Sequence, residues 1–188
     1  MSIMDPVEHS LPLDQFYREL NWPSLPEELC NELAEYYSPD HVENIYARPM
    51  HKDDATPTVK SDTFLMHTLV HQQVHDWIKS NLNFSDDYTI SIQKIKHGLY
   101  PHKDYYRNSS YNFVVTKDAG TTTRWHSNGG IRILHEVQYK PRVWYHHQSR
   151  VMHSVELEDP MVNRVAITVF ITEKMPGWAP PRAAPEDV

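Results

Sequence analysis

The hydrophobic pattern of the chain changes at residue 88. From Tyr88 onward, apolar and β-branched residues alternate with polar ones, and clusters of Pro, Gly, Asn and Asp separate the segments. A period of two places successive side chains on opposite faces of a strand, so the second half is predicted to form short strands that pair into sheets. The expected strands are 88–97, 110–117, 121–126, 131–139, 142–146, 149–153 and 164–172, with earlier ones near 15–20 and 43–47.

The first half carries two helical patterns. Ser24, Pro26 and Glu27 supply a capping hydroxyl, an early proline and a glutamate, and predict a helix through Tyr37. Apolar residues at helical spacing predict a second helix over about 63–82. Short strands covered by at least two helices indicate a mainly β fold with flanking α structure. We expect a cupin-like jelly roll with helices packed on one sheet.

We expect one domain to account for all 188 residues, because a chain of this length is suited to a single core. We expect helical support over about 1–87, the β core over about 88–172, and an irregular, proline-rich tail over 173–188.

Composition restricts the partners and the compartment. The formal net charge of -7 gives no broad basic field for phosphates and argues against a nucleic acid partner. Cys30 is the only cysteine, which excludes an intramolecular disulfide and a cysteine-based zinc site. We find no export signal and no apolar stretch of membrane-spanning length, and expect a cytoplasmic protein.

The strongest candidate for a metal site begins at His102. His102 and Asp104 lie two positions apart after a predicted strand, so in an extended chain both side chains point to the same side. His153 follows 51 positions later (153 minus 102), again at a strand. Two imidazoles and one carboxylate on one face of Fe(II) leave three positions open for O₂ and a bidentate 2-oxo acid. Arg164, at the head of the last predicted strand, can bind a carboxylate through its forked guanidinium.

Other histidines compete for this role. A His-x-Asp triplet is weak evidence alone, since 13 His and 13 Asp in 188 residues yield about one by chance. A second copy, His51-Lys52-Asp53, lies in a polar stretch that we interpret as a solvated loop. His146 and His147 lack an arginine at the corresponding distance, and we interpret them as surface or supporting residues. His71 and His75 share a helix face without a third ligand nearby.

The combined motifs resemble a known family. The segment Pro101-His102-Lys103-Asp104-Tyr105-Tyr106-Arg107, followed by Asn112-Phe113, His153 and Arg164, is similar to the Fe(II)/2-oxoglutarate-dependent oxygenase superfamily. Within it the chain looks most like small single-domain members from phages and marine bacteria. The resemblance covers about residues 88–172. It implies a double-stranded β-helix, which agrees with the jelly roll expected from the alternation of apolar and polar residues. It also implies a 2-oxoglutarate-dependent dioxygenase.

The resemblance also implies site residues and cofactors. His102, Asp104 and His153 would hold Fe(II), and Arg164 would bind the distal carboxylate of 2-oxoglutarate. O₂ would be the oxidant, and ascorbate is a further candidate.

Residues near the metal segment are candidates for the rest of the pocket, with core packing or surface ion pairs as alternatives. Those expected to bind the cofactor are Tyr100 and Asn112, and those expected to contact substrate are Arg107, Arg124 and Trp125.

The expected reaction is hydroxylation of an unactivated C–H bond in a small molecule or in a peptide or protein residue, with demethylation and desaturation open. One alternative is a cupin-like metal-binding protein without 2-oxoglutarate, which has no need of Arg164. Another is a non-catalytic structural or interaction protein with a β-sandwich. The compartment would be bacterial cytoplasm, or that of the infected host cell for a phage-encoded protein. Substrate and oligomeric state stay open.

Overall fold

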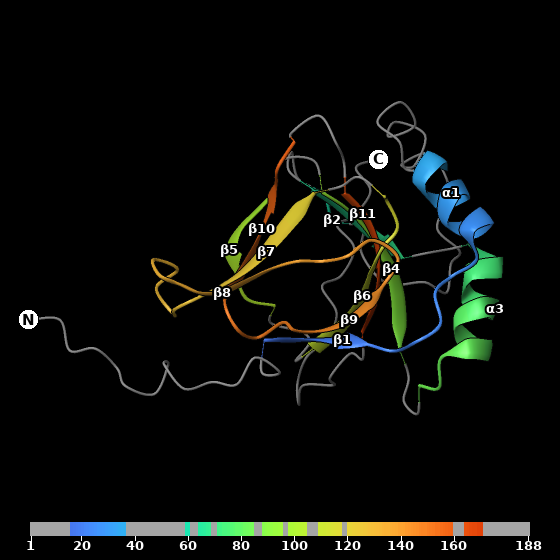
Figure 1. The fold of residues 1–188 in the computed structure, drawn as a ribbon, viewed down its shortest axis with the longest axis horizontal. Coiled ribbons are helices and arrows are strands. Elements are labelled where there is room, and N and C mark those ends of the chain that lie inside the picture. Colours follow the sequence, from blue (N-terminus) through green and yellow to red (C-terminus); the bar gives the residue numbers. More distant parts are fainter. Residues whose placement is uncertain are drawn as a thin grey trace, which may run out of the picture.

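Two antiparallel sheets and two helices form the described part of the protein. Figure 1 shows three layers: a smaller sheet, a larger sheet and a helical layer. This is the predicted mainly β jelly roll with flanking helices. The described helices are too short and too polar to cross a membrane. The computed structural model describes residues 16–36, 59–60, 64–68, 71–84, 88–95, 98–104, 109–117, 120–159 and 164–170.

The larger sheet has the strand order β1-β9-β6-β11-β4-β3-β2, and the smaller sheet has the order β5-β10-β7-β8. The strands of the larger sheet are β1 (Tyr17–Leu20), β2 (Val59–Lys60), β3 (Phe64–Thr68), β4 (Thr89–Ile95), β6 (Ser109–Val114), β9 (Trp144–Gln148) and β11 (Arg164–Phe170). The strands of the smaller sheet are β5 (Leu99–His102), β7 (Thr121–His126), β8 (Ile133–Gln138) and β10 (His153–Leu157).

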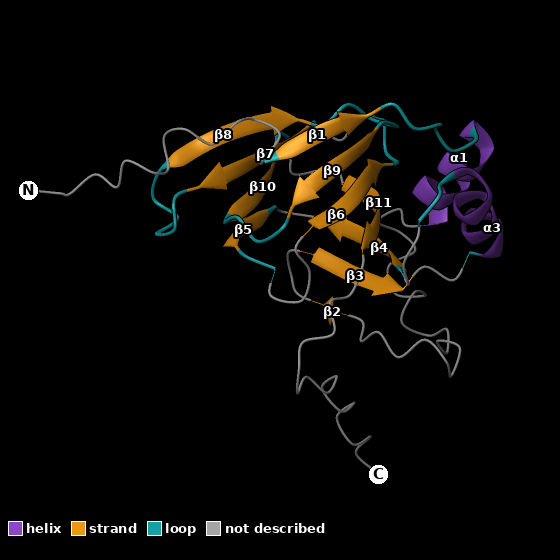
Figure 2. Ribbon diagram, turned by 90° about the horizontal axis from the view of Figure 1, so that it is seen from below, coloured by secondary structure: helices purple, strands orange, loops and turns teal. Residues whose placement is uncertain are grey.

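Helices α1 (Glu27–Tyr36) and α3 (Gln72–Asn81) cover one face of the larger sheet, as Figure 2 shows from a second direction. Leu33 of α1 and Ile78 of α3 are fully buried, and they belong to one core cluster with Ile92 and Ile167 of the sheet. Burying an aliphatic side chain of this size contributes roughly 1.5–3 kcal/mol. The apolar stripes of the two helices therefore hold this layer in place.

Strand β11 lies at the centre of the larger sheet and is buried on both faces. Val165 and Ile167 belong to the cluster beneath the helices, whereas Ala166 belongs to the cluster between the two sheets. Alternation along the strand puts Arg164 on the same inner face as Ala166. A guanidinium thus enters the space between the sheets.

The structure corrects the start of the second helix. A helix was expected from about residue 63, but Phe64–Thr68 forms β3 and the helix begins at Gln72. Strand β3 pairs with β4 from Phe64 opposite Ile95 to Thr68 opposite Ser91. The pattern of a short apolar run fits a helix or a strand equally well. Here the segment is a strand because it pairs with β4. The N-terminal half consequently supplies strands as well as helices.

A second correction concerns the strand that carries His153. It was expected to end at this residue, but Ser149 and Arg150 form a turn and β10 begins at His153. The residues up to His102, which no expected strand included, form strand β5. The remaining expected strands agree with the structure to within a few residues. The expected strand at 43–47 and the tail from residue 173 lie outside the described residues.

Gly98 allows β5 to lie close to β10. Its φ of 90° is in the left-handed region, and a Cβ there would lie 2.6 Å from the carbonyl oxygen of Val155. We expect Gly98→Ala to lower the free energy of unfolding by about 1–3 kcal/mol, because the backbone must shift or stay strained. Urea denaturation measures the change. Gly129→Ala is the matched control, since a Cβ there meets only the Ile131 side chain at 3.8 Å. Equal effects of the two substitutions would contradict this explanation.

Candidate metal centre

Three side chains with metal-ligating atoms meet where β5 pairs with β10. His102, at the end of β5, is directly opposite His153 at the start of β10, and their ring centroids are 4.4 Å apart. The Asp104 Oδ1 atom lies 3.9 Å from Nε2 of His102. One ligating atom from each residue lies within 4.8 Å of the others. A single ion placed among them can therefore contact all three.

Backbone hydrogen bonds orient both imidazoles. His102 Nδ1 lies 2.8 Å from the carbonyl oxygen of Tyr100, and His153 Nδ1 lies 2.8 Å from that of Val151. A carbonyl oxygen only accepts, so Nδ1 carries the proton of each neutral ring and Nε2 carries the lone pair. Histidines that bind metals commonly donate their other ring nitrogen in this way. The donor set of two imidazoles and one carboxylate fits Fe(II).

The backbone also fixes the segment that carries Asp104. The Asp104 N–H donates to the carbonyl oxygen of Ser149 at 3.0 Å, which joins the end of β5 to the turn before β10. Lys103, between the two candidate ligands, directs its ammonium to Asn128 Oδ1 at 2.7 Å. The cluster therefore depends on main-chain contacts at both strands.

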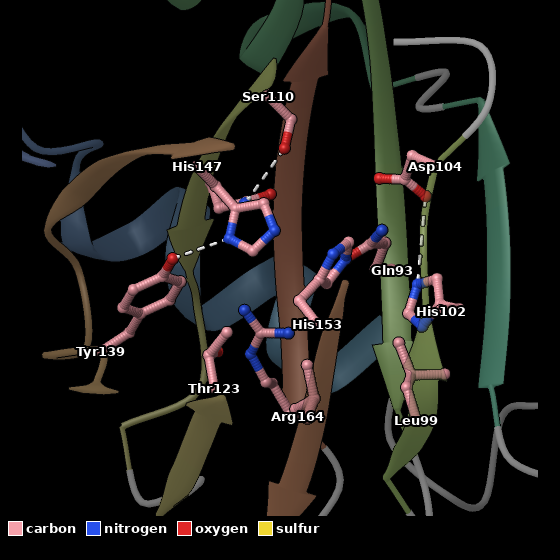
Figure 3. Close-up of a pocket in the computed structure, with 12 residues that line it drawn as sticks. Gln93, Leu99, His102, Asp104, Ser110, Thr123, Tyr139, His147, His153 and Arg164 are labelled. Carbon is pink, nitrogen blue, oxygen red and sulfur yellow. Dashed lines mark hydrogen bonds and ion pairs between the residues drawn. The ribbon is translucent and has the colours of Figure 1, made fainter. Parts of the chain in front are cut away.

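A pocket between the sheets connects the three candidate ligands with Arg164 (Figure 3). Asn112 lies in its wall, where the sequence placed it. The Thr168 hydroxyl donates to Asn112 Oδ1 at 2.8 Å, and Asn112 Nδ2 donates to Ser110 Oγ at 3.2 Å, so the amide is held at both ends. The other lining residues are Gln93, Leu99, Ser110, Thr123, Tyr139, His147 and Val155.

Arg164 is a buried cation in this pocket. The residue is 3% exposed, and its Nε has no hydrogen-bond partner. Burial lowers the pKa of the guanidinium to about 10, against an opposing effect of Tyr139, so the group is still protonated at neutral pH. Among the described residues no carboxylate forms an ion pair with it. A buried charge without a counter-ion is unfavourable by several kcal/mol, and this end of the pocket therefore favours an anionic ligand.

None of these other lining residues was predicted as a pocket residue, and two of them, His147 and Tyr139, are joined by a hydrogen bond. His147 was expected at the surface or in a supporting position, and the expectation of a surface position is wrong. It is 5% exposed, and its ring lies 4.5 Å from that of His153. Tyr139, which follows β8, shares a hydrogen bond of 2.9 Å with His147 Nδ1. The alternation along β9 was the available signal, because it places His147 on the inner face with Tyr145 and His146 on the helix side.

The structure does not bring Tyr100 or Arg124 to this pocket. The Tyr100 side chain is 83% exposed, and only its carbonyl oxygen takes part, through His102. Arg124 alternates with the pocket residue Thr123 and therefore lies on the other face of β7. There it forms an ion pair of 3.1 Å with Glu136, and a further one with Glu156.

The structure describes Trp125 but not Arg107. Trp125 is fully buried and packs between the sheets with Phe16 and Tyr17, so it serves the core rather than the pocket lining. Arg107 lies outside the described residues, as does the second His-x-Asp triplet at 51–53. His71 shares a contact of 3.0 Å with Glu32 and links α3 to α1.

Comparison with known proteins supports the fold. Neither a family model nor a curated protein matches the chain. A prolyl hydroxylase from Trichoplax adhaerens, solved with a peptide fragment of the hypoxia inducible factor oxygen degradation domain, has a TM-score of 0.51 at 12% identity, with 84% of each chain covered. A prolyl-4-hydroxylase from Pseudomonas putida has a TM-score of 0.49 at 12% identity, covering 84% of this chain and 92% of that one. The chain thus shares a jelly-roll fold with the Trichoplax adhaerens protein.

The assignment of the ligands predicts how metal affinity responds to mutation. We expect His153→Ala to weaken binding of Mn(II), used in place of Fe(II), by more than about 100-fold. Loss of a ligand should exceed the 10–100-fold effect typical of its hydrogen-bonding partners. Isothermal titration calorimetry measures the change. His146→Ala, on the helix side of β9, should leave the affinity within about twofold. Wild-type affinity in His153→Ala would exclude this centre.

Proposed function

We propose that the protein is an Fe(II)- and 2-oxoglutarate-dependent dioxygenase that hydroxylates an unactivated C–H bond. The observation that carries this proposal is the buried guanidinium of Arg164, in the same pocket as His102, Asp104 and His153. Fe(II) held by these three residues would keep open positions for a chelating 2-oxo acid and O₂. A dicarboxylic acid bound there by its 2-oxo end can place its other carboxylate at the guanidinium.

Each group of residues has a distinct task in this proposal. His102, Asp104 and His153 hold the ion through two Nε2 atoms and a carboxylate oxygen. When bound, Fe(II) supplies the chemistry of O₂ activation coupled to decarboxylation of the 2-oxo acid. Arg164 orients the co-substrate, and its charge acts strongly because little water screens it at 3% exposure. The substrate class we propose is a small molecule or a peptide or protein residue, since the net charge of -7 disfavours nucleic acid.

The second candidate is a cupin-like protein that binds a metal without 2-oxoglutarate. It explains the His-Asp-His cluster equally well. It gives no reason for the cost of burying Arg164 without a carboxylate among the described residues. A non-catalytic β-sandwich explains neither feature.

Succinate formation tests the proposed activity. The purified protein is loaded anaerobically with Fe(II) and then given 2-oxoglutarate and air. We expect slow succinate production in the absence of substrate, and its loss in His153→Ala. A wild-type protein that binds iron but neither binds nor consumes 2-oxoglutarate would favour the cupin-like alternative. A protein that binds no iron would leave the non-catalytic interpretation.

Because no described carboxylate pairs with Arg164, substituting this residue should have opposite effects on ligand binding and on stability. We expect Arg164→Met to weaken 2-oxoglutarate binding by about 100-fold, and to raise the free energy of unfolding of the ligand-free protein by about 1–4 kcal/mol. Calorimetric titration and urea denaturation measure the two effects. Arg124→Met is the control: its ion pairs lie outside the pocket, so 2-oxoglutarate binding should be unchanged and stability should change by less than about 1 kcal/mol. Reduced stability in Arg164→Met would show that the guanidinium has a structural partner.

A further inference from the structure

Tyr139 separates two pockets. It lines the pocket that contains the metal ligands and Arg164, and it also lines a second pocket that opens beside the ends of β6, β7 and β8. Among the described residues, Tyr139 is the one side chain that both linings share. The second pocket is lined further by Val114, Lys117, Thr121, Gln138 and Lys140. Tyr139 therefore forms the partition between the two pockets.

The partition is held at both its ring and its hydroxyl. The ring stacks on Tyr145 with centroids 4.3 Å apart and an interplanar angle of 12°. The hydroxyl shares the hydrogen bond of 2.9 Å with His147, and Tyr139 is 5% exposed. Turning the ring out of the way would break a buried stack and a buried hydrogen bond together. The wall is therefore fixed in the folded protein.

Tyr139 also lies beyond Arg164 as seen from the metal ligands. In Figure 3 its ring is on the opposite side of the Arg164 guanidinium from His102 and Asp104. Burial raises the pKa of the Tyr139 phenol, against an opposing effect of Arg164. The phenol stays neutral and does not act as the counter-ion of the guanidinium. The Tyr139 ring therefore limits the space beyond Arg164 and does not neutralise the charge of the guanidinium.

We propose that Tyr139 limits the length of the dicarboxylic acid that the pocket accepts. The inference rests on the proposed function, in which the metal ligands fix the 2-oxo end and Arg164 fixes the far carboxylate. A diacid with an additional methylene must extend its carboxylate past the guanidinium, where the ring of Tyr139 lies. Without the ring, the space would continue into the second pocket. Lys117 and Lys140 line that pocket, paired at present with the exposed Glu27 and Glu19.

Calorimetric titration of the Mn(II)-loaded protein with 2-oxoglutarate and with 2-oxoadipate, which is one methylene longer, tests the inference without turnover. We expect the wild type to bind 2-oxoglutarate at least tenfold more tightly. In Tyr139→Ala and Tyr139→Leu this preference should fall at least tenfold, mainly through tighter binding of 2-oxoadipate. Tyr139→Phe keeps the ring and removes the hydroxyl, and it should retain the wild-type preference.

The outcomes distinguish this inference from the proposed function. A wild type that binds both acids equally overturns the role of Tyr139 but leaves the proposed function standing. The same holds if the preference is unchanged in Tyr139→Leu, which keeps apolar volume and remains informative where Tyr139→Ala does not fold. A wild type that binds Mn(II) but neither acid overturns the proposed function, and this inference with it.

Discussion

His102 and His153 are neighbours because β5 and β10 pair with these two residues opposite each other. Directly opposed residues in an antiparallel pair have Cα atoms about 4.5–5.5 Å apart, close enough for two imidazoles on one face to share an ion. The approach of the strands requires Gly98, and the Asp104 N–H joins the third candidate ligand to the turn before β10. The candidate centre is therefore a product of main-chain pairing, and the side chains add the ligating atoms.

Arg164 imposes the second constraint on the structure. Strand β11 is buried on both faces, so the Arg164 side chain is only 3% exposed, and its charge is retained in the interior. Such a group lowers stability unless an anion accompanies it. Burial of the apolar clusters on either side of β11 can offset this loss of stability, and a carboxylate ligand would remove it. In the proposed function, stability and ligand binding would be coupled through Arg164.

The sequence predicted the parts of the fold and pocket that depend on local pattern. The period of two located most strands, and the spacing of His102, Asp104 and His153 anticipated their meeting. It did not show which face of a strand points inward, so Arg124 was expected in a pocket that its neighbour Thr123 lines. Tyr139 was missed because its position depends on partners from other strands. Strand β3 was missed because a short apolar run does not reveal its pairing partner.

The most direct test of the account is anaerobic visible spectroscopy of the protein with Fe(II) and 2-oxoglutarate. A 2-oxo acid that chelates ferrous iron through its carboxylate and its keto oxygen gives a charge-transfer band in the visible range. We expect this band when both Fe(II) and 2-oxoglutarate are present, and none with glutarate, which lacks the keto group. No band at saturating Fe(II) and 2-oxoglutarate would contradict the proposal that the His-Asp-His cluster and Arg164 form one co-substrate site.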